Sequence, residues 1–181
     1  MPLLDRASVV QNCYVVNDLR AACKRYHEVY GVGPFFVFDH IPLVKNWYRG
    51  KEMPLDISAA FVQSGDLNIE FIQQHNDGPS CYRDMFKPGE EGFHHTAIFC
   101  KDYAAEKKAF EAAGFPIANE FQTSPETFLC YTDTRSALGH MIELYQDHAG
   151  VRGMYAMIKE AAQNWNGKDI FHNPGGGSAN P

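Results

Sequence analysis

The sequence predicts an α+β protein made of two tandem modules, each with the element order βαβββ. Two observations support this prediction. Residues 10–26 align with residues 94–110 when the chain is shifted by 84 positions, so that Asp18 falls on Asp102. The same order of strands and helix then follows in both copies. Because a duplicated unit decides the architecture of a chain, this repeat is the strongest fold signal in the sequence.

The first copy opens with a strand and a capped helix. An apolar run over residues 11–16 predicts the strand, and Asp18 follows it as a helix N-cap. Apolar residues then recur at helical spacing up to Gly31, which is typical of a helix end. The rest of this copy is expected to contain a strand over residues 35–40, a polar loop over 45–54, and strands over 56–63 and 67–73.

The second copy repeats this order. A strand over residues 95–100 precedes Asp102, and a helix is expected from there to Gly114. Three strands are expected next, over residues 117–122, 127–132 and 140–145. The predicted division of the chain is a first module over residues 1–75, a linker over 76–92, a second module over 93–147, a helical C-terminal extension over 148–172, and a flexible tail over 173–181.

Composition excludes several classes of protein. With 181 residues, 45% of them hydrophobic, the chain has room for one core or for two small modules that share a site. A net charge of −6 and the absence of a basic run exclude a nucleic-acid partner. No segment approaches the roughly 20 apolar residues of a membrane span, and the first residues lack the apolar segment of a signal peptide. We therefore expect a cytoplasmic protein with no membrane contact. Five scattered cysteines without a CxxC pair are expected to be reduced core residues.

Four polar residues occupy matched positions in the two copies. Gln11 and His95 lie at the start of the first strand of each copy, and Glu70 and Glu143 lie in the last strand, each after an isoleucine. A buried carboxylate costs several kcal/mol unless it is compensated. One interpretation is that each glutamate faces solvent. The other is that a pseudo-twofold axis brings all four together, where three oxygen ligands and one imidazole suit a six-coordinate divalent ion with two open positions.

The adjacent histidines His94 and His95 need separate interpretation. Neighbouring residues of a strand face opposite sides, so both cannot easily bind one ion. The repeat selects His95, because it is the residue matched with Gln11. His94 is expected on the other face of the sheet, with a structural role.

The segments GFHHTAIFCKDY, LNIEFIQ and LGHMIELY, together with the paired βαβββ order, resemble the vicinal oxygen chelate superfamily over residues 8–147. This resemblance implies that the two modules form a cupped mixed sheet around a central site, the glyoxalase-like fold. The superfamily includes glyoxalase I, methylmalonyl-CoA epimerase, extradiol dioxygenases and metal-free drug-binding proteins of the bleomycin-resistance type. Its paired modules often assemble across a subunit interface, so a monomer and a homodimer are both compatible with this chain.

The four matched residues are similar to the ligand set of some glyoxalase I enzymes. The resemblance therefore implies a divalent metal ion, for which Zn, Ni, Co, Mn and Fe all remain open. The two arginines that contact glutathione in those enzymes correspond here to Val15 and Glu91. We therefore expect a reaction that does not depend on glutathione.

The activity implied is that of a metal-dependent lyase or isomerase/epimerase that transfers a proton next to a carbonyl. By resemblance to glyoxalase I, Glu143 is the candidate base and Glu70 a second acid or base. The partner is a small organic substrate, such as an acyl thioester or an aromatic compound. Its candidate binding residues are Phe38, Trp47, Arg49 and Tyr131, and the alternative is that these side chains only pack the sheet or a dimer contact.

Two other functions remain open at this point. The first is a metal-free small-molecule-binding protein of the bleomycin-resistance type. The second is a non-haem iron dioxygenase of the extradiol type, in which two histidines and one glutamate hold the iron. Gln11 stands where the first of those histidines would be, which favours the lyase or isomerase.

Overall fold

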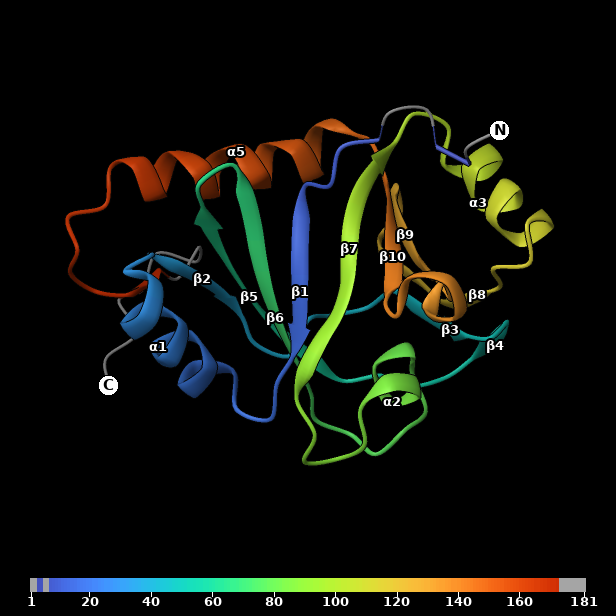
Figure 1. Cartoon of the computed structure of the whole chain (residues 1–181), viewed down its shortest axis with the longest axis horizontal. Coiled ribbons are helices and arrows are strands. Elements are labelled where there is room, and N and C mark those ends of the chain that lie inside the picture. Colours follow the sequence, from blue (N-terminus) through green and yellow to red (C-terminus); the bar gives the residue numbers. More distant parts are fainter. Residues whose placement is uncertain (1–2, 5–6, 173–181) are drawn as a thin grey trace.

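The computed structural model describes residues 3–4 and 7–172, so the predicted tail over 173–181 lies outside the described residues. In the described part, the strands form one curved, unclosed sheet in the order β11-β2-β5-β6-β1-β7-β10-β9-β8-β3-β4 (Figure 1). The strands are β1 (Gln11–Val15), β2 (Phe35–Phe38), β3 (Lys45–Tyr48), β4 (Lys51–Glu52), β5 (Ile57–Ser64), β6 (Leu67–Gln74), β7 (Gly92–Cys100), β8 (Ile117–Ser124), β9 (Thr127–Thr132), β10 (Met141–Gln146) and β11 (Phe171–His172). The helices are α1 (Leu19–Tyr30), α2 (Cys81–Met85), α3 (Tyr103–Ala112), α4 (Arg135–Leu138) and α5 (Ala149–Gln163).

The sheet contains the predicted repeat. In the first copy the order is β2-β5-β6-β1, and in the second it is β8-β9-β10-β7. The first strand of each copy pairs in parallel with its last strand, and the two first strands, β1 and β7, pair antiparallel at the centre of the sheet. The predicted α+β fold with a cupped mixed sheet is confirmed.

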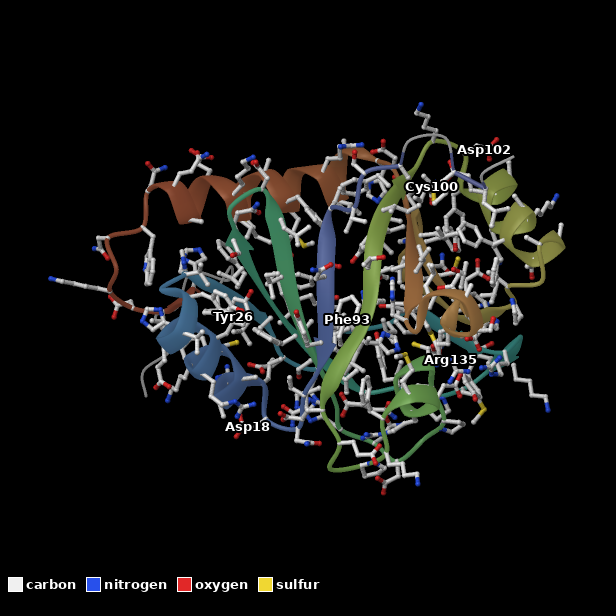
Figure 2. All side chains as sticks on the ribbon, viewed as in Figure 1. Asp18, Tyr26, Phe93, Cys100, Asp102 and Arg135 are labelled. Atoms are coloured by element: carbon white, nitrogen blue, oxygen red, sulfur yellow. The ribbon has the colours of Figure 1, made fainter. Side chains whose placement is uncertain are left out.

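The two helix caps form as the repeat predicts. The Asp18 side chain accepts a hydrogen bond from the backbone N–H of Ala21 at 2.9 Å, and Asp102 accepts one from Ala105 at 3.0 Å. Figure 2 labels both aspartates, which lie on opposite sides of the molecule at the starts of α1 and α3, as an approximate twofold relation requires.

The prediction of a loop over residues 45–54 is wrong, because this segment contains the hairpin of β3 and β4. Arg49 and Gly50, both with positive φ (46° and 79°), make the two-residue turn between these strands. β3 pairs with β8, so a segment of the first copy extends the sheet of the second. The sequence pattern missed this strand because the polar residue Asn46 is buried in it. The Asn46 side chain is satisfied there by hydrogen bonds: its amide donates to the Met53 carbonyl and its oxygen accepts from Asn119.

Two further segments complete the core. Helix α2 lies within residues 76–92 and buries Cys81 and Tyr82 beneath the second copy. Helix α5 crosses the molecule along one end of the central strands (Figure 1), packs mainly on β5, and buries Val151 and Ile158. All five cysteines are buried and free, as expected. None of the helices in the described residues is long and apolar enough to span a membrane.

Candidate active site

The pairing of the central strands places the matched residues around one point. Cys13 lies beside Glu70 in the β1–β6 pair, and Ala97 lies beside Glu143 in the β7–β10 pair. Cys13 and Ala97 are thus equivalent, with the 84-residue offset predicted from the sequence, and Gln11 is equivalent to His95 by the same offset. Across the β1–β7 pair Gln11 faces Ala97 and Cys13 faces His95, so both copies contribute to one centre.

Three of the four candidate ligands are in direct contact. His95 Nε2 lies 3.0 Å from Glu143 Oε2 and 3.4 Å from Glu70 Oε2. All three side chains are buried, with no more than 5% of either carboxylate side chain exposed. Gln11 is buried on the same strand face as Cys13, and its amide Nε2 donates to Asn68 Oδ1 at 3.1 Å.

His94 does not lie on the opposite face from His95, as strand alternation predicts. In the β1–β7 pair Cys13 faces His95 and Tyr14 faces Phe93, so His94 is an extra residue in β7. Such a bulge turns two successive side chains toward the same side of a sheet. The two imidazoles therefore meet, with their Nδ1 atoms 2.8 Å apart, and both are fully buried.

This contact fixes which ring nitrogen of His95 carries the hydrogen. His94 Nε2 lies 3.1 Å from the Cys81 carbonyl, which can only accept, so His94 Nε2 must donate. Burial and the neighbouring His95 hold the pKa of His94 well below its ordinary value, so its ring is neutral and its Nδ1 is an acceptor. His95 Nδ1–H donates to that acceptor. In the neutral ring, the lone pair of His95 is then at Nε2, facing the two glutamates.

The two carboxyl groups have unusual electrostatics. Burial raises the pKa of Glu143 to about 8, although the nearby Tyr131 and Tyr145 hydroxyls partly oppose this by hydrogen bonding. Burial also raises the pKa of Glu70; the contact with His95 opposes the shift and the charge of Glu143 adds to it. A lone pair and a carboxylate oxygen at 3.0 Å repel each other unless a proton or a cation lies between them. Without a cation, a proton on Glu143 satisfies the His95 contact.

The donor set fits a divalent metal ion. Gln11 Oε1 and Glu70 Oε2 are buried acceptors with no hydrogen-bond partner among the residues that the structure describes, which is costly unless a ligand satisfies them. By the repeat, the residues that would hold the ion are Gln11, Glu70, His95 and Glu143, through three oxygens and one imidazole nitrogen. In the described residues, ligand atoms of Glu70 and His95 lie within 4.8 Å of each other, and Glu143 joins them through its contact with His95. Oxygen-rich mixed ligation of this kind suits a six-coordinate first-row ion better than a closed tetrahedral zinc site.

Cys13 is a member of this centre that the sequence did not reveal. Its sulfur, a Glu70 oxygen and a His95 nitrogen lie within 4.8 Å of one another. Burial, with the charge of Glu70 as a smaller cause, raises the pKa of the Cys13 thiol well above its ordinary value, which keeps the thiol protonated. The sequence feature that could have identified Cys13 was its position two residues after Gln11, on the same face of the strand.

A cavity of about 310 Å³ lies beside the two glutamates. Its wall is mostly apolar and comes from strands of both copies, from the segment after β2, and from the start of α5. Glu70 and Glu143 are its carboxylates, and no Lys or Arg is among the lining residues in the described part of the chain. His148, the N-cap of α5, lies at this wall with its Nε2 2.9 Å from Thr127 Oγ1.

The structure brings two of the four substrate-binding candidates to this cavity and leaves two away from it. Phe38 and Tyr131 line it. Trp47 and Arg49 do not, because β3 pairs with the outer strand β8 and Arg49 is held by an ion pair to Asp133 at 3.0 Å.

The sequence pattern missed the contributions of Ile41, Leu43 and Met154 to the cavity wall. The signal for Met154 was the apolar face of the C-terminal helix, which by itself is also explained by core packing. Ile41 and Leu43 follow the last residue of β2, where no periodicity exists to place them.

Comparison with known proteins agrees with this fold. A family model for the glyoxalase/bleomycin resistance protein/dioxygenase superfamily matches residues 10–131, which is more than half of the chain. The chain therefore belongs to this superfamily, the vicinal oxygen chelate superfamily that its motifs resemble. No curated protein matches the sequence.

Solved structures of similar fold share little sequence with this chain. One is a hypothetical protein, BH1468, from Bacillus halodurans C-125, with 17% identity, a TM-score of 0.55, and coverage of 80% of this chain and 97% of that one. Another is methylmalonyl-CoA epimerase from Mycobacterium tuberculosis, with 15% identity, a TM-score of 0.51, and coverage of 83% and 96%. At this identity the likeness shows the fold alone.

Proposed function

We propose that this chain is a divalent-metal-dependent lyase or isomerase/epimerase that moves a proton on a carbon next to a carbonyl. The observation that carries the proposal is His95 Nε2, 3.0 Å from Glu143 and 3.4 Å from Glu70, beside a mostly apolar cavity. The fold relation to methylmalonyl-CoA epimerase agrees with this reaction class but does not assign the substrate.

Each residue of the centre has a role in this proposal. When bound, the ion supplies Lewis-acid stabilisation of the enolate oxygen. Gln11 and His95 hold it from the two central strands. Glu143 takes the proton from the substrate carbon and Glu70 returns a proton to it, since both carboxyl groups lie at the wall of the cavity. The apolar wall excludes water from the carbanion.

The cavity also limits the substrate. Its volume of about 310 Å³ is at the lower end of the range of small-molecule pockets, and no Lys or Arg among the described lining residues neutralises an anion. The reacting part of the substrate is therefore compact and uncharged apart from its metal-binding oxygens. An acyl or aromatic group fits, whereas the charged end of an acyl thioester or of glutathione would have to remain outside.

The test is proton exchange with solvent. Wild-type protein loaded with Mn²⁺, Co²⁺, Ni²⁺ or Zn²⁺ is incubated in D₂O with α-hydroxyketones, 2-oxo acids and acyl thioesters, and deuterium at the α-carbon is measured by mass spectrometry. We expect exchange with at least one substrate class, lost on metal removal. Glu143→Gln should reduce the exchange rate at least 100-fold.

Controls separate catalysis from binding. His95→Ala should lose the metal and the exchange, whereas Glu126→Gln, an exposed change in the β8–β9 turn, should alter neither. Full exchange by metal-loaded Glu143→Gln would exclude Glu143 as the base. A wild-type protein that takes up no divalent ion at the buried centre would overturn the metal-dependent reaction.

The alternative is metal-free binding of a small apolar molecule, and one observation favours it. The hydrogen-bond chain from Cys81 through His94 and His95 is complete without an ion when Glu143 is protonated. Tight binding of a neutral aromatic ligand to chelator-treated protein would support this function. An extradiol dioxygenase has less support, because Gln11 replaces one of its iron-binding histidines.

A further inference from the structure

A second group of metal-binding side chains lies at one edge of the first module. Strand β2 ends at Phe38, β5 begins at Ile57 and β6 ends at Gln74, and these three strands are neighbours in the sheet. The residues just beyond these ends, His40, Asp56 and His75, therefore come together. One nitrogen of each imidazole and one Asp56 oxygen lie within 4.8 Å of one another.

The backbone around this cluster is held in place. His75 N–H donates to the Asp56 carbonyl at 2.9 Å, and Asp56 N–H donates to Asn76 Oδ1 at 3.1 Å. His40 has a positive φ of 47°, and its N–H donates to Ser58 Oγ at 2.9 Å, whose hydroxyl is also 2.7 Å from His75 Nε2. The backbone of the three residues and the His75 ring are thus positioned before any ligand arrives, which lowers the entropy cost of binding.

The geometry of the side chains suits a shared cation. His40 Nδ1 lies 2.8 Å from Asp56 Oδ1, and the rings of His40 and His75 are stacked with centroids 4.4 Å apart. Two ligands about 2.0–2.1 Å from a tetrahedral ion are roughly 3.3 Å apart, so a small separation of His40 and Asp56 would admit one. Both side chains are exposed, by 64% and 44%, and can make that shift.

We propose that His40, Asp56 and His75 bind a divalent transition-metal ion, with water completing its coordination. Two imidazole nitrogens and one carboxylate oxygen suit Zn²⁺, Ni²⁺, Co²⁺ or Cu²⁺ better than Mg²⁺ or Ca²⁺, which prefer oxygen. The neighbouring Asp39 does not compete for the ion, because Arg20 holds its carboxylate through two hydrogen bonds of 2.9 and 2.8 Å.

Because of the position of this site, an ion bound there would also affect the wall of the cavity. Residues 39–44 connect β2 to β3, and Ile41 and Leu43 from this segment line the cavity beside the glutamates. Ile41 N–H already donates to the Ile57 carbonyl at 2.8 Å, next to Asp56. A metal ion bridging His40 to Asp56 and His75 would fasten the start of this segment to the sheet and order the cavity wall.

The test is Zn²⁺ titration of the chelator-treated full chain by calorimetry, with bound metal counted after gel filtration by mass spectrometry. His40→Ala, His75→Ala and Asp56→Asn are each expected to lose one ion per chain or to weaken its binding at least tenfold. His140→Ala removes a histidine elsewhere and should leave binding unchanged. Hydrogen exchange of residues 39–44 should slow when Zn²⁺ is added to wild-type protein but not to His40→Ala.

Each outcome separates this site from the buried centre. An ion that is lost in His40→Ala but retained in Glu143→Gln supports the site at His40, Asp56 and His75, whether or not the proposed reaction is observed. Equal Zn²⁺ binding by wild type, His40→Ala and His75→Ala overturns it, even if Glu143→Gln loses an ion. Circular dichroism shows whether the variants are folded, and Asp56→Asn keeps the side-chain volume if an alanine variant is not.

Discussion

His95 is defined by what lies at each end of its ring. On one side its Nδ1–H is given to His94, which in turn donates to the Cys81 carbonyl. On the other side its Nε2 faces two buried carboxyl groups. Residues that orient a metal-binding histidine in this way keep its lone pair directed at the ion. The β-bulge that places His94 beside His95 is therefore a functional part of the proposed centre.

Replacing His94 tests this orientation. His94→Phe keeps a ring of similar size but removes the acceptor for His95 Nδ1–H, so we expect metal affinity at the buried centre to fall about 10–100-fold. Competition with a chelator of known affinity measures the change. Thr96→Val alters the next residue on the opposite face of β7 and is the control. Unchanged affinity in His94→Phe would exclude a role in orienting His95.

The raised pKa of Glu143 predicts how the stability of the metal-free protein changes with pH. Its pKa is raised from 4.5 to about 8 on folding, so the folded state binds a proton that the unfolded state has released between these values. The contribution of this group to stability is therefore greatest below about pH 5 and is lost as the pH rises toward 8. Urea unfolding in the presence of EDTA at several pH values measures this decline as the difference between wild type and Glu143→Gln, because the lowered pKa of the buried His94 makes the stability of both proteins change with pH in the opposite direction.

Glu143→Gln should flatten that dependence, because the neutral amide does not titrate. The exposed Glu126→Gln serves as the control and should keep the wild-type slope. Saturating divalent metal should also reduce the loss at pH 8 in the wild type, since a bound cation replaces the proton. A difference in stability between wild type and Glu143→Gln that does not fall from pH 5 to pH 8 in EDTA would contradict this prediction.

At the scale of elements, the β3–β4 hairpin joins the two copies. It belongs to the first copy in sequence, but it pairs with β8 and extends the second copy of the sheet. Asn119 of β8 is the centre of this junction: its Nδ2 donates to Asn46 Oδ1 at 2.6 Å and to the Trp47 carbonyl at 3.2 Å. Its Oδ1 accepts from Cys81 N–H at 2.7 Å, which attaches α2 as well.

Asn119→Ala should therefore be strongly destabilising. The change removes the hydrogen-bond partner of three polar groups on β3 and α2, at about 1–3 kcal/mol for each group that water cannot reach. We expect a loss of about 3–5 kcal/mol in the free energy of unfolding, measured with urea. Asn164→Ala, at the exposed end of α5, should change it by less than about 1 kcal/mol. A loss below about 1 kcal/mol for Asn119→Ala would show that the junction contributes little.

At the scale of the whole molecule, the repeat explains which features the sequence could predict. The offset that matches Gln11 with His95 also relates Cys13 to Ala97 in the sheet, because both follow from one duplicated unit. Features that break the symmetry left no such signal. The β3–β4 hairpin and the bulge at His94 depend on contacts between distant segments, and neither hydrophobic periodicity nor strand alternation contains that information.

The cavity was unpredictable for a related reason. Phe38 and Tyr131 could be named from their residue type, but Trp47 and Arg49, chosen on the same grounds, lie on the outer part of the sheet. Helix α5 lines the cavity with Val151 and Met154 although it lies outside both copies. Which aromatic and apolar residues surround a site depends on the path of the chain between the repeats, and the repeats do not specify that path.

The same connections predict that the two copies unfold together. Proteins with separable modules often unfold in steps, but here one sheet runs through both copies, β3–β4 crosses from the first to the second, and α5 packs back onto β5. The fluorescence of the two tryptophans reports on unfolding at opposite ends of this assembly. Trp165 contacts His27 of α1 in the first copy, and Trp47 lies in β3 on the far side of the second.

Trp47→Phe and Trp165→Phe each leave one fluorescent probe in the full chain, because the sequence contains two tryptophans. We expect each variant to show the same urea midpoint by its remaining tryptophan as by circular dichroism, within about 0.2 M, since a single cooperative transition must look alike to every probe. The comparison within one variant removes any effect of the substitution on stability. If the Trp165 signal were lost well before the Trp47 signal, or the reverse, the copies would be separate folding units, and the site they share would be lost when the first of them unfolds.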